Sequence, residues 1–157
     1  MTTSGMVHEM DVAVAGGARG TSRRRGSRGL QVGLWVAQGL LATAFGVAGA
    51  THASQPIAEM AKFAPWTGAL PEGLVRFIGM MELAGALGLV LPALTRIRPV
   101  LTAWAGAGLA TVMALASVVH LVRGEPQVLP VNLVLGGLAA FIAWGRFGRA
   151  AIAPRAR

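Results

Sequence analysis

The sequence predicts an all-α integral membrane protein that folds as a four-helix bundle. Charged residues make up only 13% of the 157 residues, about half of the roughly 25% that is usual in soluble domains. Hydrophobic residues make up 54%, and four long runs of the chain are nearly free of charge. This composition excludes an ordinary soluble enzyme and an intrinsically disordered protein.

The first apolar run covers residues 30–51 and contains no charged residue. At about 1.5 Å per residue, a helix of this length crosses a hydrocarbon core of roughly 30 Å. Backbone groups inside hydrocarbon must be paired within the protein, and no period-two alternation points to strands, so we predict helices for all four runs. The predicted spans after the first cover residues 72–93, 100–122 and 128–145.

The segments around these spans are polar or rich in proline. Residues 1–29 are basic and rich in glycine, and we predict a disordered cytoplasmic arm there. The four-helix domain takes up residues 30–148, and a basic cytoplasmic tail follows at residues 149–157. Within the domain, residues 52–71 hold three prolines and are predicted to form the one long loop.

Basic residues gather on one side of the predicted membrane. Five arginines lie in the arm, two in the link between the second and third helices, and four near the C-terminal end, whereas the loops on the opposite side hold only Lys62 and Arg123. The positive-inside bias therefore predicts that both termini face the cytoplasm. The first run exceeds the apolar core of about 7–15 residues of a signal peptide, so we interpret it as a retained span. The arginine-rich arm beside it is expected to contact anionic lipid and not nucleic acid.

Small side chains recur at four-residue spacing along each predicted helix. Such stripes let helix backbones approach closely in a membrane, where no hydrophobic effect drives association. We expect them to pack the spans together, or to pair the chain with a protein partner or with a second copy. The stripes consist of Ala42, Gly46 and Ala50; Ala84 and Gly88; Ala103 and Ala107; Gly106, Ala110 and Ala114; and Gly136 and Ala140.

Glu82 lies near the middle of the second predicted span. An ionised side chain at that depth costs about 2.5–3.5 kcal/mol on membrane-insertion scales. We therefore expect Glu82 to face the bundle interior, to pair with a cation or to carry a proton. Arg76 is the expected partner, although six residues place it about 120° away around the helix. A purely structural ion pair is the alternative to a functional site.

Further polar residues lie toward the same, outer ends of the predicted helices. In an antiparallel bundle they come near one level, and we predict a polar cavity that binds the head group of a quinone or a lipid. The histidines match no compact metal-ligand motif, so we predict no metal site. The chain has no cysteine, which excludes disulfides and a thiol nucleophile, and we assign no catalytic residues. The candidate cavity residues are His52, Arg76, Glu82, His120 and Asn132.

The segment at residues 76–92 reads RFIGMMELAGALGLVLP. It resembles the second-helix signature of the DoxX / DoxX-like family, in which a basic residue precedes IGxxE and an LGLxLP ending. HLVRGE at residues 120–125, followed by VNLVL and AWGRF, resembles later landmarks of that family, and the resemblance covers about residues 32–147. The sequence departs from the family at His52 and Arg76, where many members carry lysine.

The resemblance implies a four-helix protein of the bacterial-type plasma (inner) membrane. The family takes its name from a small subunit of an archaeal quinone-linked thiosulfate oxidoreductase, and some bacterial members are linked to oxidant defence in complexes with soluble enzymes. It therefore implies an accessory or anchoring subunit of a redox or oxidative-stress-related membrane complex. The residues leave a second hypothesis open, a membrane protein that binds a quinone or a lipid in the polar cavity. We do not expect independent catalytic activity, because the sequence shows no cofactor motif and no deep pair of histidines.

Overall fold

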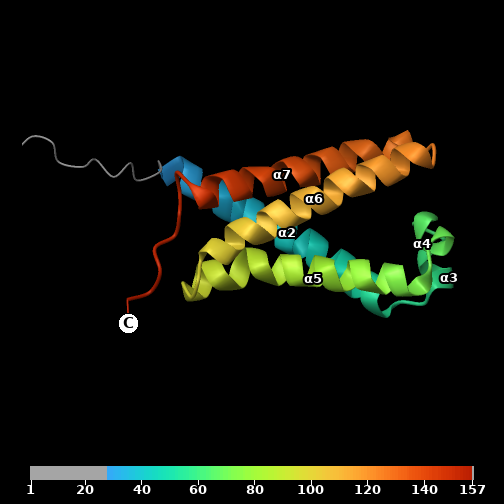
Figure 1. Ribbon diagram of the computed structural model, residues 1–157, viewed down its shortest axis with the longest axis horizontal. Helices are drawn as coiled ribbons and strands as arrows, with labels where there is room; N and C mark the ends of the chain where they lie inside the picture. The colour runs from blue at the N-terminus through green and yellow to red at the C-terminus, as the bar shows by residue number, and fades with distance from the viewer. Residues whose placement is uncertain (1–27, 157) are drawn as a thin grey trace, which may run out of the picture.

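The computed structural model describes residues 28–156, which contain helices and no strand. Four long helices form a bundle (Figure 1), which confirms the predicted all-α fold class. The predicted arm lies outside the described residues, except that its last two residues begin the first long helix. The elements are α2 (Arg28–Ser54), α3 (Ile57–Met60), α4 (Trp66–Ala69), α5 (Glu72–Thr95), α6 (Val100–Val122), the 3₁₀ turn η1 (Pro126–Val128) and α7 (Leu129–Phe147).

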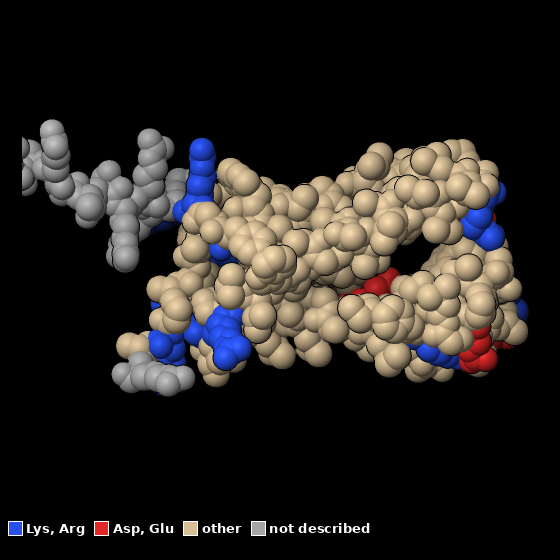
Figure 2. Space-filling view, viewed as in Figure 1, with Lys and Arg blue, Asp and Glu red and all other residues tan. Residues whose placement is uncertain are grey.

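The four long helices are long and apolar enough to cross a membrane. Their outward-facing side chains are largely apolar. Figure 2 shows a broad band of uncharged residues between two charged ends, and within this band acidic atoms are visible only inside an opening. The chain is therefore a multi-pass membrane protein whose helices contact the lipid bilayer. Which end faces the cytoplasm stays a prediction from the positive-inside bias.

The two ends of the bundle carry different segments (Figure 1). The start of α2, the α5–α6 link and the C-terminal residues lie at one end, which we call the terminal end. Helices α3 and α4 and the α6–α7 connection lie at the other, which we call the loop end. At the terminal end, the backbone N–H of Arg155 donates to the carbonyl oxygen of Arg96 at 3.1 Å, so the C-terminal residues pack against the α5–α6 link.

The connection between α2 and α5 differs from the loop predicted at residues 52–71. Helix α2 continues to Ser54, and the rest of the stretch contains α3 and α4. Pro56 and Pro65 directly precede these two short helices, at a position where a missing N–H costs little. The prediction of one long loop was wrong because it treated these prolines only as helix breakers.

Close backbone contact holds α2 against α5. A Cβ atom added to Gly49 would lie 2.7 Å from the carbonyl oxygen of Gly79, and one added to Gly79 would lie 2.7 Å from the backbone nitrogen of Ala53. Gly106 has the same role between α6 and α7, where an added Cβ atom would lie 2.9 Å from the carbonyl oxygen of Ala139. Because glycine has no side chain, the backbones of each helix pair approach closely at these positions.

Contacts are most extensive within two helix pairs, α2 with α5 and α6 with α7. The pairs join toward the terminal end, where Leu34 of α2 packs over Gly145 of α7 and Gly88 of α5 meets Ala105 of α6. Toward the loop end the two pairs diverge (Figure 1). The core that joins them includes Leu34, Leu41, Phe45, Leu89, Leu109 and Ile142.

Candidate functional site

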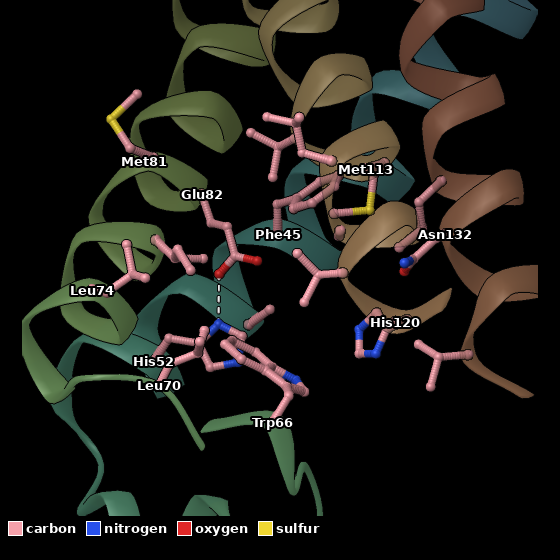
Figure 3. Close-up of a pocket in the computed structure, with 18 of the residues that line it drawn as sticks. Phe45, His52, Trp66, Leu70, Leu74, Met81, Glu82, Met113, His120 and Asn132 are labelled. Carbon is pink, nitrogen blue, oxygen red and sulfur yellow. Dashed lines mark hydrogen bonds and ion pairs between the residues drawn. The ribbon is translucent and has the colours of Figure 1, made fainter. Parts of the chain in front are cut away.

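A cavity of about 450 Å³ lies between the two helix pairs at the loop end. Its volume is within the range of roughly 300–1,000 Å³ that is typical of small-molecule sites. Figure 2 shows an opening on the side where α5 and α6 lie in front of α2, and Figure 3 shows the cavity walls. The walls are mostly apolar. Besides the indole of Trp66, their polar side chains are those of His52, Glu82, His120 and Asn132.

Glu82 pairs with His52 across the contact between α5 and α2. Nδ1 of His52 lies 2.7 Å from Oε2 of Glu82, and only 6% of Glu82 is exposed (Figure 3). Trp66 of α4 packs edge-on against the His52 ring, with the ring centroids 5.0 Å apart. The hydrogen bond gives one carboxyl oxygen a partner at a depth where an unpaired charge is costly.

The expected pair of Arg76 and Glu82 does not form. Nη2 of Arg76 instead donates to Oε1 of Glu72 at 2.9 Å. Its Nη1 donates to the backbone carbonyl oxygens of His52 and Gln55 at 2.9 and 2.7 Å. The prediction was wrong because six residues of helix turn Arg76 away from Glu82. Arg76 lies outside the cavity lining and holds the end of α2, with His52, against α5.

His120, on the opposite wall, belongs to a second cluster of a histidine with a carboxylate. Nδ1 of His120 lies 2.7 Å from Oε2 of Glu125, and Arg123 donates from Nε and Nη2 to Oε1 of Glu125 at 3.0 and 2.8 Å. Two hydrogen bonds hold the pKa of Glu125 below its usual range. The bond from Arg123 has the larger effect and the bond from His120 the next largest. The bond to Glu125 in turn raises the pKa of Arg123.

The lowered pKa of Glu125 predicts how this cluster responds to acid. Its stabilising effect is full above the ordinary carboxyl pKa and is lost as the pH falls through the lower folded value. We expect the difference in melting temperature between the wild type and Glu125→Gln to persist from neutral pH down to about pH 5, and to shrink as the pH falls further through the lowered pKa of Glu125. A difference already lost near about pH 6 would contradict the assigned contacts.

Asn132 lies in the cavity wall and carries a buried donor that the described part of the chain leaves unused. Its side chain is only 7% exposed, and its Nδ2 has no hydrogen-bond partner within residues 28–156. Figure 3 shows Asn132 close to His120, on the wall opposite Glu82 and His52. A buried amide nitrogen without a partner costs about 1–3 kcal/mol. Within the described residues, this donor is therefore left for an acceptor that does not belong to the chain.

The two histidines also keep one nitrogen each for a ligand. Both use Nδ1 for their carboxylate, and the described part of the chain provides no hydrogen-bond partner for either Nε2. The cavity thus offers hydrogen-bonding groups on two facing walls. Within residues 28–156, no group of three or more His, Cys, Asp or Glu side chains is arranged to hold a metal ion.

Comparison with known families identifies the chain. The family model described as the DoxX-like family matches residues 36–142. This chain belongs to the DoxX-like family. The match confirms the resemblance drawn from the sequence landmarks, and it includes the polar cavity residues His52, Glu82, His120 and Asn132. No curated protein and no solved structure matches this DoxX-like protein.

The DoxX-like protein also contains a buried polar cluster that the sequence reasoning missed. The sequence groups Arg146 with the basic C-terminal end, yet its side chain is only 3% exposed. Its Nε donates to Oε1 of Gln38 at 2.7 Å, and its Nη1 donates to Oε1 of Gln31 at 2.8 Å. Nε2 of Gln38 donates onward to the carbonyl oxygen of Leu89 at 2.6 Å. The available signal was Gln38 itself, a polar residue within an apolar run.

Proposed function

We propose that this DoxX-like protein binds a small amphiphilic molecule of the quinone or lipid class, with the polar head of the molecule in the cavity. One observation carries the proposal: the buried Nδ2 of Asn132, unpaired within residues 28–156, lies in the wall of an apolar cavity of about 450 Å³. Once the amide turns its nitrogen toward the cavity, an acceptor oxygen of the ligand would bind this donor and remove the cost of leaving it unpaired.

The facing polar walls fit a ring that carries acceptor oxygens at two opposite edges, as a quinone does. Asn132 and His120 lie on one wall, and His52 with its partner Glu82 lies on the other (Figure 3). Each histidine ring is fixed by the contact of its Nδ1 with a carboxylate. A neutral ring whose Nδ1–H donates to that carboxylate presents Nε2 as an acceptor for a ligand hydroxyl, whereas a protonated ring donates from Nε2 to a ligand carbonyl. A bound quinone supplies reversible redox chemistry, while the residues of this chain hold and orient its oxygens.

The role of an accessory or anchoring subunit in a redox or oxidative-stress-related complex is supported by the family alone. A cavity for a membrane-dissolved molecule agrees with such a role, because a subunit that holds this molecule can present it to a partner. The ligand-binding function ranks first because specific side chains of this chain support it. The distribution of basic residues supports the further proposal that the cavity lies near the outer face of a bacterial-type inner membrane, with both termini cytoplasmic.

Asn132→Leu tests the ligand-binding function. The probe is a decyl-substituted benzoquinone, titrated into detergent-purified, full-length protein by isothermal titration calorimetry. We expect the wild type to bind it and the variant to bind it about tenfold more weakly, because one hydrogen bond of about 1.4 kcal/mol is lost. Leucine has nearly the shape of asparagine, so the cavity wall keeps its form.

Thr102→Val is the matched control for this experiment. Oγ1 of Thr102 is also buried without a hydrogen-bond partner in the described residues, but Thr102 does not line the cavity. Its replacement is expected to leave the affinity for the probe unchanged. A wild type that does not bind the probe would overturn the proposed function, as would an Asn132→Leu variant that binds the probe as tightly as the wild type.

A further inference from the structure

We infer that the ligand is a lipid-dissolved amphiphile with a neutral head and an apolar tail, and that the tail leaves the cavity between α5 and α6 into the bilayer. This inference rests on the proposed function and narrows its class of ligand. It follows from the charge of the cavity walls, from the chemistry of the opening between α5 and α6, and from the depth at which that opening lies.

The charge of the walls matches a neutral head and not a phosphate. Among residues 28–156, Glu82 is the one acidic residue that lines the cavity, and no Lys or Arg of this range lines it. The two arginines at the loop end, Arg76 and Arg123, are each bound to a glutamate. An anionic head would therefore face the Glu82 carboxyl group with no lysine or arginine of the described lining to balance it. Carbonyl or hydroxyl oxygens need only hydrogen-bond partners such as Asn132.

The cavity opens sideways between α5 and α6. Six residues that line the cavity are exposed, three from α5, two from α6 and the small Ala44 from α2. The five from α5 and α6 are large and apolar, and Figure 2 shows an opening on this side of the bundle, with acidic atoms inside it. We call this set the mouth, and it consists of Leu74, Phe77, Met81, Leu115 and Val119.

The mouth lies along the membrane-spanning stretches and extends to the middle of a span. Met81 lies near the centre of α5, and Leu115 lies about two turns before the end of α6. At this depth the mouth faces hydrocarbon and not water. A ligand that passes through it is therefore already dissolved in the bilayer. An apolar tail covers the mouth side chains without desolvating any polar group, which favours a tailed ligand.

The experiment compares two probes that share one head. Decyl-substituted benzoquinone and the same benzoquinone without the tail are added to full-length protein in lipid nanodiscs, and their concentrations are expressed per lipid. Occupancy is read by native mass spectrometry. We expect the tailed probe to bind the wild type at least about tenfold more tightly, because the tail is buried against the mouth. Lysophosphatidic acid, which has one tail and an anionic head, is not expected to displace the tailed probe.

Tryptophan substitutions fill the mouth from either side. Leu115→Trp on α6 and Met81→Trp on α5 are each expected to weaken binding of the tailed probe about tenfold and to change that of the tail-less probe less than about twofold. Leu133→Trp is the matched control, because Leu133 is an exposed apolar residue of α7 that does not line the cavity. It is expected to affect neither probe.

The outcomes separate this inference from the function on which it rests. Equal affinity of the wild type for both probes would overturn the mouth between α5 and α6 while leaving cavity binding in place. The mouth between α5 and α6 is also ruled out if the tryptophan variants weaken the binding of both probes equally or of neither. Displacement of the tailed probe by lysophosphatidic acid would overturn the neutral head. Failure of the wild type to bind either probe would overturn the proposed function itself.

Discussion

Gly79→Ala is expected to lower the free energy of unfolding by about 3 kcal/mol and to weaken ligand binding at the same time. The added methyl group would lie 2.7 Å from the backbone nitrogen of Ala53 and 2.9 Å from the carbonyl oxygen of Gly49. Backbone atoms cannot rotate away as a side chain does, so α2 and α5 must move apart. His52 and Glu82 lie beside this contact, and their hydrogen bond of 2.7 Å would lengthen as well.

Gly39→Ala in α2 is the matched control for Gly79→Ala. A Cβ atom added to Gly39 would meet nothing within 4 Å, and alanine favours a helix over glycine by about 1 kcal/mol. We therefore expect unchanged or slightly higher stability. Both variants are followed by circular dichroism during unfolding of the purified protein in increasing sodium dodecyl sulfate. A midpoint for Gly79→Ala equal to that of the wild type would contradict the close contact of α2 with α5.

Arg146→Ala is expected to destabilise the bundle by about 3 kcal/mol, because it leaves buried acceptors without their donor. The guanidinium donates to the side chains of Gln38 and Gln31, and also to the carbonyl oxygen of Ala150 at 3.0 Å. It lies over the ring of Trp35, with Cζ 5.2 Å from the ring centroid. Gln38 is fully buried, so its Oε1 cannot turn to water instead.

Arg149→Ala removes the same charge from an exposed position near Arg146. The guanidinium of Arg149 lies 5.5 Å from the ring centroid of Trp144, and such a contact contributes about 0.5–1 kcal/mol at an exposed site. Melting temperatures of the two variants in detergent separate buried hydrogen bonds from net charge. A loss for Arg149→Ala as large as that for Arg146→Ala would show that charge, and not the buried cluster, accounts for the effect. The double variant Arg146→Ala, Gln38→Leu is expected to lose less than the sum of its single changes.

The four spans follow from the sequence because a bilayer leaves a chain few options. A run of about 20 residues without charge must form a helix there, since no water is present to satisfy its backbone. The short helices α3 and α4 are different, because only a few residues form each of them and the prolines around them are typical of loops as well. The same stretch carries Trp66, and no sequence pattern places that ring against His52.

Glu82 shows how much of the candidate site could be predicted. The cost of a charge in hydrocarbon predicts that this side chain is buried and paired, which the structure shows. The choice of His52 over Arg76 as the partner depends on how α2 lies against α5. That arrangement is set by Gly49 and Gly79, and a chain with 22 glycines gives no sign that these two differ from the rest.

The burial of Arg146, by contrast, could not be predicted from the sequence. An arginine near the end of a membrane helix either reaches toward water or turns into the bundle, and its position in the sequence is the same in both cases. The structure turns Arg146 inward because two glutamines on the neighbouring helix α2 provide acceptors. Such a cluster becomes visible only when the two helices are placed side by side.

Native mass spectrometry of the full-length protein, purified in mild detergent without added ligand, tests the cavity most directly. Every small molecule released from the protein is identified by its mass and its fragments. We expect the wild type and Thr102→Val to carry one neutral, tailed molecule per chain, and Asn132→Leu to have lost most of it. A wild type that carries no small molecule, or an Asn132→Leu variant as fully occupied as the wild type, would contradict the proposed binding site.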